Sequence, residues 1–294
     1  MSRGAASVWR FDAIGTRWEI ESATALTERQ RERVRAVVDR FDAEWSRFRD
    51  DSVVRRLGAR GGSAPAPADA ADMLAVYREL SAATGGAVNP LVGGSLEAAG
   101  YDAALTLRPG APVPAPADWE RMLECTASVL TLRAPATIDV GALGKGRLVD
   151  LVAAVLHDVP GRLVVDASGD LAVRGGGIRV GLEHPYHPSR AIGVVEVADA
   201  ALCASATNRR SWGAGLHHVL DARTGAPVRT WVATWALAAD AMHADAAATA
   251  LFFDGGPRLA DRWGVHWVRM STDGRAERSH GFPGELFTLT GPGR

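Results

Sequence analysis

Apolar residues recur at helical spacing in two stretches of the N-terminal half. In the first, Thr27 and Gln30 form the capping-box pattern that marks a helix start. The apolar face that follows consists of Val34, Val37, Val38, Phe41 and Trp45. The second stretch closes at Gly85 and Gly86, as helices commonly do. Its apolar face consists of Met73, Val76, Tyr77 and Leu80. We therefore predict two amphipathic helices, each with one buried face.

Runs typical of β-strands occupy the start of the chain and most of its second half. We predict one strand over 8–21, bent at Ile14–Thr16. A strand, a turn and a second strand are predicted over 162–174. Shorter strands are expected at 178–182, 191–197 and 201–203. The stretches 58–68 and 108–118 are rich in glycine, alanine and proline, which predicts surface loops.

The stretch from Thr137 to Val155 combines a short β-type run, a glycine-rich turn around Lys145 and an apolar helical pattern. Glycines at 141, 144 and 146 would let backbone N–H groups approach a ligand, and the following helix adds the positive end of its dipole. This combination suits an anion site for a phosphate or pyrophosphate. The alternative, a tight strand-to-helix turn with a solvated lysine, has equal weight on this stretch alone. Two better-known phosphate loops fit poorly: a Walker loop needs Ser or Thr after the lysine, where this chain has Gly146, and the G-x-G-x-x-G spacing of a dinucleotide-binding loop is absent.

Two further stretches carry polar groups that can do chemistry. The helix predicted over 244–253 places Asp245 and Thr249 one turn apart on one face. A carboxylate and a hydroxyl suit a hard cation such as Mg²⁺. Taken alone, such a pair is more often structural, serving the helix dipole and a backbone hydrogen bond. The segment from His217 to Gly225 contains two adjacent histidines and Asp221, for which catalytic and structural roles are weighed equally.

Composition limits the classes of function. With 294 residues, 47% hydrophobic and 23% charged, the chain can form one large core or two closely packed subdomains. A net charge of −1 gives no electrostatic reason to expect nucleic acid or an acidic membrane surface as a partner. Cys125 and Cys203 give no disulfide framework and suit a reducing compartment. Residues 1–20 lack the apolar core of a signal peptide or anchor, and no later run has membrane-spanning length, so we expect a cytoplasmic protein.

Eight short segments match, in order, the motifs of one known family. They read I-G-T-R-W (14–18), S-R-F-R-D-D-S (46–52), T-G-G-A-V-N-P-L-V-G (84–93), I-D-V-G-A-L-G-K-G-R-L-V-D (138–150), A-S-G-D (167–170), S-A-T-N-R-R-S-W (205–212), H-H-V-L-D-A-R-T-G-A-P (217–227) and A-D-A-A-A-T-A (244–250). Together they resemble the ApbE family, the FAD:protein FMN transferases, over about residues 11–253. The resemblance implies an α+β fold of two intertwined T-fold-like subdomains with the site between them, forming one domain over 1–294.

The resemblance also implies roles for individual residues. The FAD-contacting positions of the family fall on Ile14, Phe48, Ala87, Val88, Asn89, Asp139, Lys145 and Val219. Its metal site falls on Ala142, Asp245, Ala248 and Thr249, the alanines through their backbone carbonyls. His218 matches the family histidine, and an imidazole that titrates near pH 7 suits the base that takes the acceptor's proton. Asp221 would orient His218 or share its role.

Four positions depart from the family pattern. Asn89 replaces the usual Asp and so removes a charge from the flavin pocket. The other replacements are Ser168 for a Gly, Ala204 for a Thr and Ala222 for a Pro. Because the metal pair, Lys145 and His218 are retained, we expect an active protein with a modified pocket.

The implied reaction is Mg²⁺-dependent transfer of FMN from FAD. A Thr or Ser hydroxyl of an acceptor protein, in a sequence resembling D-x-x-[ST]-G-A-[ST], attacks the FMN-side phosphorus, and AMP leaves. Phosphoryl transfer needs positioning and neutralisation of charge, for which Asp245 and Thr249 with Mg²⁺, and Lys145, are suited. Two alternatives stay open: a Mg²⁺-dependent FAD pyrophosphatase that uses water, and a non-catalytic FAD-binding protein.

Overall fold

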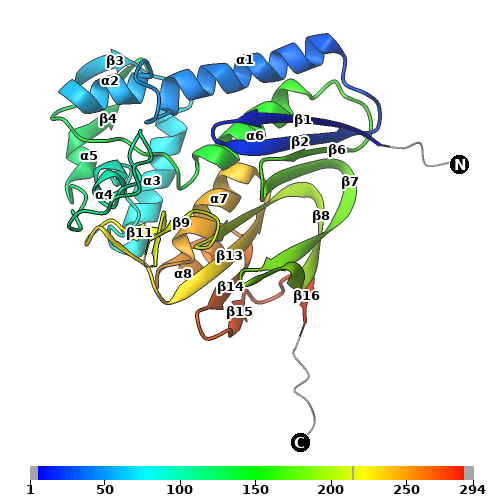
Figure 1. Ribbon diagram of the computed structural model, residues 1–294. Helices are drawn as coiled ribbons and strands as arrows, with labels where there is room; N and C mark the ends of the chain where they lie inside the picture. The colour runs from blue at the N-terminus through cyan, green and yellow to red at the C-terminus, as the bar shows by residue number, and fades with distance from the viewer. Residues whose placement is uncertain (1–5, 214, 288–294) are drawn as a thin grey trace, which may run out of the picture.

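An antiparallel sheet of nine strands is the largest unit in the described part of the chain (Figure 1). The computed structural model describes residues 6–213 and 215–287; residues 1–5, 214 and 288–294 of the predicted 1–294 domain lie outside the described residues. In spatial order the strands are β1 (Ser7–Ala13), β2 (Thr16–Ser22), β6 (Leu163–Asp166), β7 (Asp170–His184), β8 (His187–Ala206), β13 (Trp231–Ala238), β14 (His266–Ser271) and β15 (Ala276–Arg278), with β16 (Gly284–Leu286) paired to β8.

The prediction of one bent strand over 8–21 is wrong, because the chain reverses at Ile14–Gly15. Both residues have positive φ, 46° and 72°, which gives the tight turn of a two-residue hairpin. β1 and β2 therefore pair antiparallel, with Ala13 opposite Thr16. The strand–turn–strand prediction over 162–174 is confirmed by β6 and β7. The three shorter strands predicted at 178–203 are parts of the long β7–β8 hairpin.

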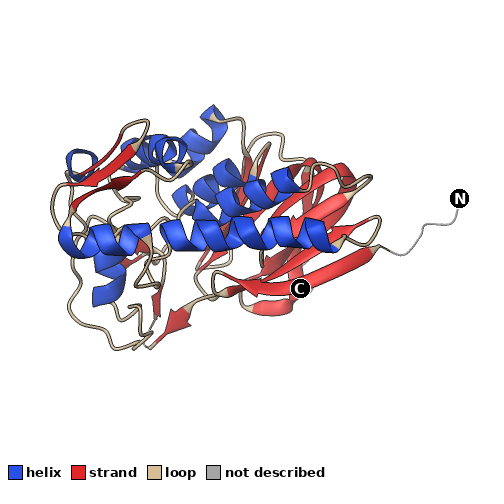
Figure 2. Ribbon diagram, turned by 90° about the horizontal axis from the view of Figure 1, so that it is seen from above, coloured by secondary structure: helices blue, strands red, loops and turns tan. Residues whose placement is uncertain are grey.

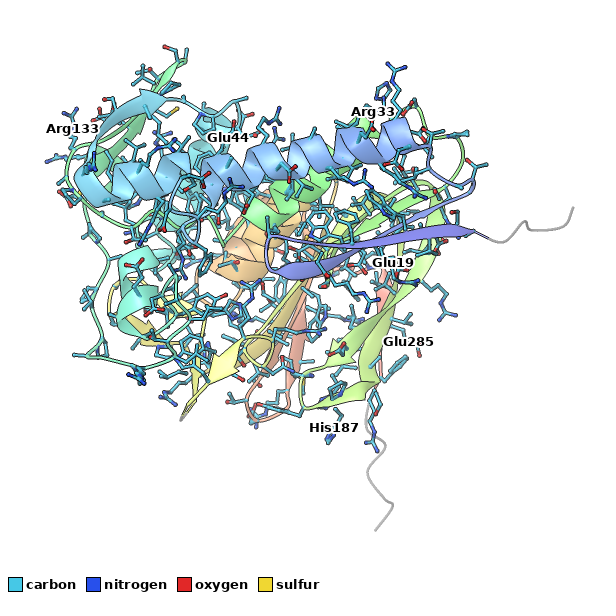
Figure 3. The ribbon with its side chains drawn as sticks, turned by 45° about the horizontal axis from the view of Figure 1, so that its top comes forward. Glu19, Arg33, Glu44, Arg133, His187 and Glu285 are labelled. Carbon is cyan, nitrogen blue, oxygen red and sulfur yellow. The ribbon has the colours of Figure 1, made fainter. Side chains whose placement is uncertain are left out.

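Three helices connect the sheet with the rest of the molecule. Helix α7 (Ala241–Ala250) packs on β8 and β13, α6 (Gly144–Val155) packs on α7, and α1 (Glu28–Trp45) packs on α6. The capping box predicted at Thr27 and Gln30 is confirmed, with side-chain bonds in both directions. In Figure 3, α1 runs along the top of the molecule, with Arg33 and Glu44 toward its two ends. Its buried residues are Val34, Val38, Phe41 and Trp45, four of the five predicted.

The segment between α1 and α6 forms a mainly helical part beside the sheet (Figure 2). Its helices are α2 (Val53–Arg60), α3 (Ala70–Thr84), α4 (Gly93–Ala98) and α5 (Trp119–Met122), and α8 (Gly256–Arg262) packs against α3. The predicted end of α3 is confirmed, because Gly85 caps it in the left-handed conformation. The surface loop predicted over 58–68 is wrong in part. There β3 (Gly62–Pro65) pairs with β5 (Val129–Leu132), which also pairs with β4 (Leu123–Cys125).

Short strand pairs complete the fold near the end of β8. They are β9 (Ser211–Trp212) with β10 (Leu216–His217), and β11 (Leu220–Asp221) with β12 (Ala226–Pro227). One hydrophobic core extends from Trp18 through Leu80 and Val152 to Ala250 and so joins the sheet to the helical part. Antiparallel sheets with helices packed beside them confirm the expected α+β class. None of the described helices is both long and apolar enough to cross a membrane.

Candidate active site

A cavity of about 620 Å³ lies where the β1–β2 turn, the end of α1, the 87–92 and 139–145 segments and α7 meet. It is lined by residues that are far apart in sequence, and 11 of the predicted site residues are among them: Ile14, Phe48, Ala87, Val88, Asn89, Asp139, Ala142, Lys145, His218, Val219 and Thr249. Three predicted residues, Asp221, Asp245 and Ala248, are not part of the lining. The fold therefore gathers most of the residues that the resemblance singled out.

Lys145 is half-buried, with its side chain 22% exposed, and it is ion-paired rather than freely solvated. The 137–140 stretch forms no strand, and α6 begins at Gly144, so Lys145 sits in the first helical turn. Its Nζ lies 2.7 Å from Asp170 Oδ2 and donates to the Ala167 carbonyl at 3.3 Å. Burial lowers the pKa of Lys145, but the negative charges of Asp170 and Asp245 outweigh burial, and the pKa is raised. Lys145 is therefore a fixed cation at the cavity wall.

The glycines around Lys145 serve packing and internal hydrogen bonds. The N–H of Gly141 donates to Asp139 Oδ1 at 2.7 Å, and that of Gly146 donates to Asp245 Oδ2 at 2.9 Å. A Cβ at Gly146 would lie 2.1 Å from the Ala241 carbonyl oxygen, so only glycine lets α6 approach α7 this closely. The prediction that these glycines expose N–H groups to an anion is therefore wrong for Gly141 and Gly146.

Two buried carboxylates face each other beside Lys145. Asp245, on α7, is 3% exposed, and Asp170, at the start of β7, is fully buried. Burial and the negative charge of Asp170 raise the pKa of Asp245 well above its usual range. Asp170 ends the A-S-G-D motif, but nothing local in the sequence shows which lysine or carboxylate it meets. A site with two carboxylates and one lysine suits a cation bound nearby.

The oxygen atoms around Asp245 fit a hard cation. Thr249 Oγ1 donates to the Ala142 carbonyl at 3.2 Å, which brings the hydroxyl and this carbonyl together as predicted. The carbonyl of Ala248, the fourth predicted ligand, accepts a bond from Thr234 Oγ1 at 2.7 Å, and Ala248 does not line the cavity. Across residues 6–213 and 215–287, no group of three or more His, Cys, Asp or Glu side chains is placed to hold a metal. Mg²⁺ would therefore depend on Asp245, Thr249, the Ala142 carbonyl and oxygens of the substrate.

His218 lines the cavity, whereas its neighbour is structural. His217 is buried, with Nε2 2.9 Å from the Val228 carbonyl oxygen. The Nδ1 of His218 has no hydrogen-bond partner among the described residues. Burial, and then the positive charge of Arg210, lower the pKa of His218 to about 3, far below the value near 7 that the sequence analysis assumed. The imidazole is therefore neutral in the free protein, and so low a pKa makes it a weaker base than an ordinary imidazole.

Among the described residues, the Asp221 carboxylate makes its hydrogen bonds with Arg223 and not with His218. It accepts bonds from the Arg223 side chain, with Nη2 at 2.6 Å and Nε at 2.9 Å. It also accepts from the Arg223 N–H, so the carboxylate fixes the turn that follows β11. The orienting role of Asp221 toward His218 stays a prediction.

Comparison with known proteins shows the family to which the chain belongs. The profile of the ApbE family matches residues 14–266. The chain belongs to the ApbE family. It is 30% identical, over 75% of its length, to a FAD:protein FMN transferase of Treponema pallidum, of which it covers 70%. It is 31% identical, over 69% of its length, to a FAD:protein FMN transferase of Rhodobacter capsulatus, of which it covers 42%. The crystal structure of the ApbE protein of Thermotoga maritima superposes with a TM-score of 0.81, at 21% identity, over 95% of this chain and 98% of that one.

Two of the four departures from the ApbE pattern, Asn89 and Ala222, have local explanations in this fold. Asn89 is buried, its Nδ2 donates to the Pro116 carbonyl at 2.8 Å, and its Oδ1 accepts from the Leu91 N–H at 2.8 Å. The amide thus joins the cavity wall to the 108–118 loop, and an Asp could not donate to that carbonyl. Ala222 donates its N–H to the Ala87 carbonyl at 3.0 Å, a bond that a proline would lack.

Asn89→Asp is expected to lower the free energy of unfolding by about 1–3 kcal/mol, because it leaves a buried carboxylate oxygen against the Pro116 carbonyl. Urea unfolding measures the change. Asn208→Asp is the matched control, since this exposed amide also donates to a proline carbonyl, that of Pro185. The interpretation that the buried Asn89 amide stabilises the fold would be contradicted if both variants lost the same free energy of unfolding, or if Asn89→Asp lost none.

Proposed function

We propose that this chain is a FAD:protein FMN transferase, which moves FMN from FAD onto a Thr or Ser hydroxyl of an acceptor protein and releases AMP. One observation carries the proposal: the cavity places Lys145, His218 and the oxygens of Thr249 and Ala142 on its wall, with Asp245 directly behind them. These are the cation, the base and the oxygen ligands that phosphoryl transfer needs. The two relatives that carry this name support the same reading.

In the proposed reaction the hydroxyl oxygen of the acceptor bonds to the FMN-side phosphorus of FAD. The bond from that phosphorus to the bridging oxygen breaks, and AMP leaves with the bridging oxygen. The imidazole of His218, whose Nδ1 has no hydrogen-bond partner within the described part of the chain, accepts the hydroxyl proton. Lys145, held by Asp170, stabilises the negative charge of the pyrophosphate.

Mg²⁺ bound by Asp245, Thr249 and the Ala142 carbonyl would supply further charge neutralisation at the phosphate oxygens. The ligand types fit this ion, because all three offer oxygen. Cys125 and Cys203 are unpaired, which supports placing the protein in a reducing compartment such as the cytoplasm.

The test is AMP release from FAD in the presence of Mg²⁺, with and without an acceptor protein that carries a D-x-x-[ST]-G-A-[ST] sequence. A transferase releases AMP only when the acceptor is present. Release of AMP and free FMN without the acceptor indicates the pyrophosphatase alternative. Saturable FAD binding with no AMP in either reaction indicates a binding protein.

A further inference from the structure

A second cation, Arg47, is buried at the cavity wall. It lies just after α1, lines the cavity, and its side chain is only 3% exposed. Its Nε lies 2.6 Å from Asp139 Oδ2. Both terminal nitrogens, Nη1 and Nη2, are buried and have no hydrogen-bond partner among the described residues. Unmade hydrogen bonds of a buried guanidinium are costly, so a bound molecule is the natural partner.

Asp139 holds this guanidinium in place, and its carboxylate oxygens already accept hydrogen bonds from within the protein. Its Oδ1 accepts the Gly141 N–H at 2.7 Å, its Oδ2 accepts from Arg47, and its backbone carbonyl accepts the Tyr77 hydroxyl at 3.1 Å. Both carboxylate oxygens are therefore engaged within the protein. The polar group that this part of the wall presents to a ligand is the Arg47 fork, and Asp139 is its positioning residue.

Aromatic rings surround the fork. The guanidinium carbon lies 4.2 Å from the centre of the Phe48 ring and 5.1 Å from that of Tyr101, and both rings line the cavity. Phe48 and Tyr101 meet edge to face with centres 5.6 Å apart, and Tyr101 stacks on Trp212. Phe48 is 40% exposed and lines the cavity. Aromatic walls beside two free donors suit a planar ring with two neighbouring acceptors.

We propose that Arg47 binds the acceptor edge of the isoalloxazine ring of FAD through Nη1 and Nη2; this inference rests on the proposed function. Of the two ring systems in FAD, adenine places an amino donor beside each ring acceptor on its amino edges. The isoalloxazine places a carbonyl oxygen beside a ring nitrogen that also accepts, on either side of its pyrimidine ring. A fork with two donors matches two acceptors and not an acceptor beside a donor.

Ligand titrations of the full-length protein test this assignment, with FAD, riboflavin and ADP as probes. Arg47→Gln should lower the affinities for FAD and riboflavin by a similar factor, about tenfold or more, and leave the affinity for ADP unchanged. It should also change the visible absorption spectrum of bound riboflavin, because a cation at the acceptor edge perturbs the ring. Lys145→Met should give the opposite pattern. It should lower the affinities for FAD and ADP and leave the affinity for riboflavin unchanged, because riboflavin has no phosphate.

Control variants separate binding from folding. Arg147→Gln removes another Arg–Asp pair, with buried Asp69, at a residue that does not line the cavity, and should leave all three affinities unchanged. Arg47→Lys keeps the charge but loses the fork, so it should not restore flavin affinity. If Arg47→Gln does not fold, Arg47→Lys and Asp139→Asn are titrated with the same three ligands instead.

Three results would overturn the inference. Loss of FAD and ADP affinity with riboflavin unchanged would assign Arg47 to the phosphates. Lower thermal stability with all affinities unchanged would make Arg47 purely structural. Wild-type protein that binds no FAD would remove the proposed function itself and this inference with it.

Discussion

Asp245→Asn should reduce AMP formation from FAD by on the order of 10³-fold or more, because it removes the only formal negative charge among the proposed Mg²⁺ ligands. Asn has nearly the same volume and can still accept the Gly146 N–H that Asp245 Oδ2 accepts. The change also removes one of two buried carboxylates that repel each other. Thermal unfolding should therefore show no loss of stability, and chelation of Mg²⁺ in the wild type should give the same loss of AMP formation.

Asp240→Asn is the matched control on the same helix. Asp240 caps α7 by accepting the His243 N–H, and Asn caps helices equally well. This variant should turn over at the wild-type rate. If Asp245→Asn keeps near-full Mg²⁺-dependent activity, or if both variants lose activity equally, Asp245 is not a metal ligand.

His218→Gln should lower kcat by about 10²–10⁴-fold and leave FAD affinity nearly unchanged, because it removes the proton acceptor and keeps the side-chain volume. Stopped-time AMP assays and FAD titration measure the two quantities. His217→Gln is the neighbouring control; it should cost stability through the bond to the Val228 carbonyl while turnover persists.

The pH profile of the wild type tests the same residue. In the free protein the pKa of His218 is lowered to about 3, so its neutral form predominates at every pH above that value. The profile of kcat/KM, which reports groups of the free enzyme, should then show no acid limb near pH 6.5 from this histidine. An acid limb near 6.5 that disappears in His218→Gln would show that the imidazole titrates normally and would contradict its assigned environment.

Local patterns of the sequence predicted the local parts of the fold well. The α1 capping box, the α3 apolar face and its Gly85 cap depend on residues within one or two turns, and each is confirmed. The reversal at Ile14–Gly15 was missed because a non-glycine residue rarely adopts the positive φ that this turn requires. Its neighbours on both sides have strand composition, so the pattern indicated one continuous strand.

The site needed information that the sequence pattern does not contain. The motifs gathered most of the cavity-lining residues, yet they did not show that Lys145 pairs with Asp170 or that Arg47 pairs with Asp139. The second pair joins residues 92 positions apart. The role of Gly146 likewise depends on the distance to Ala241 on another helix. Such contacts arise from how elements pack, so composition and spacing could not reveal them.

The most direct test of the account is the intact mass of an acceptor protein with a D-x-x-[ST]-G-A-[ST] sequence, measured after incubation with this chain, FAD and Mg²⁺. The account predicts one added FMN phosphoester on the first Thr or Ser of the motif, together with AMP. An acceptor whose first Thr or Ser is replaced by Ala should stay unmodified. An unmodified acceptor in a reaction that nevertheless yields AMP and free FMN would contradict the transferase assignment.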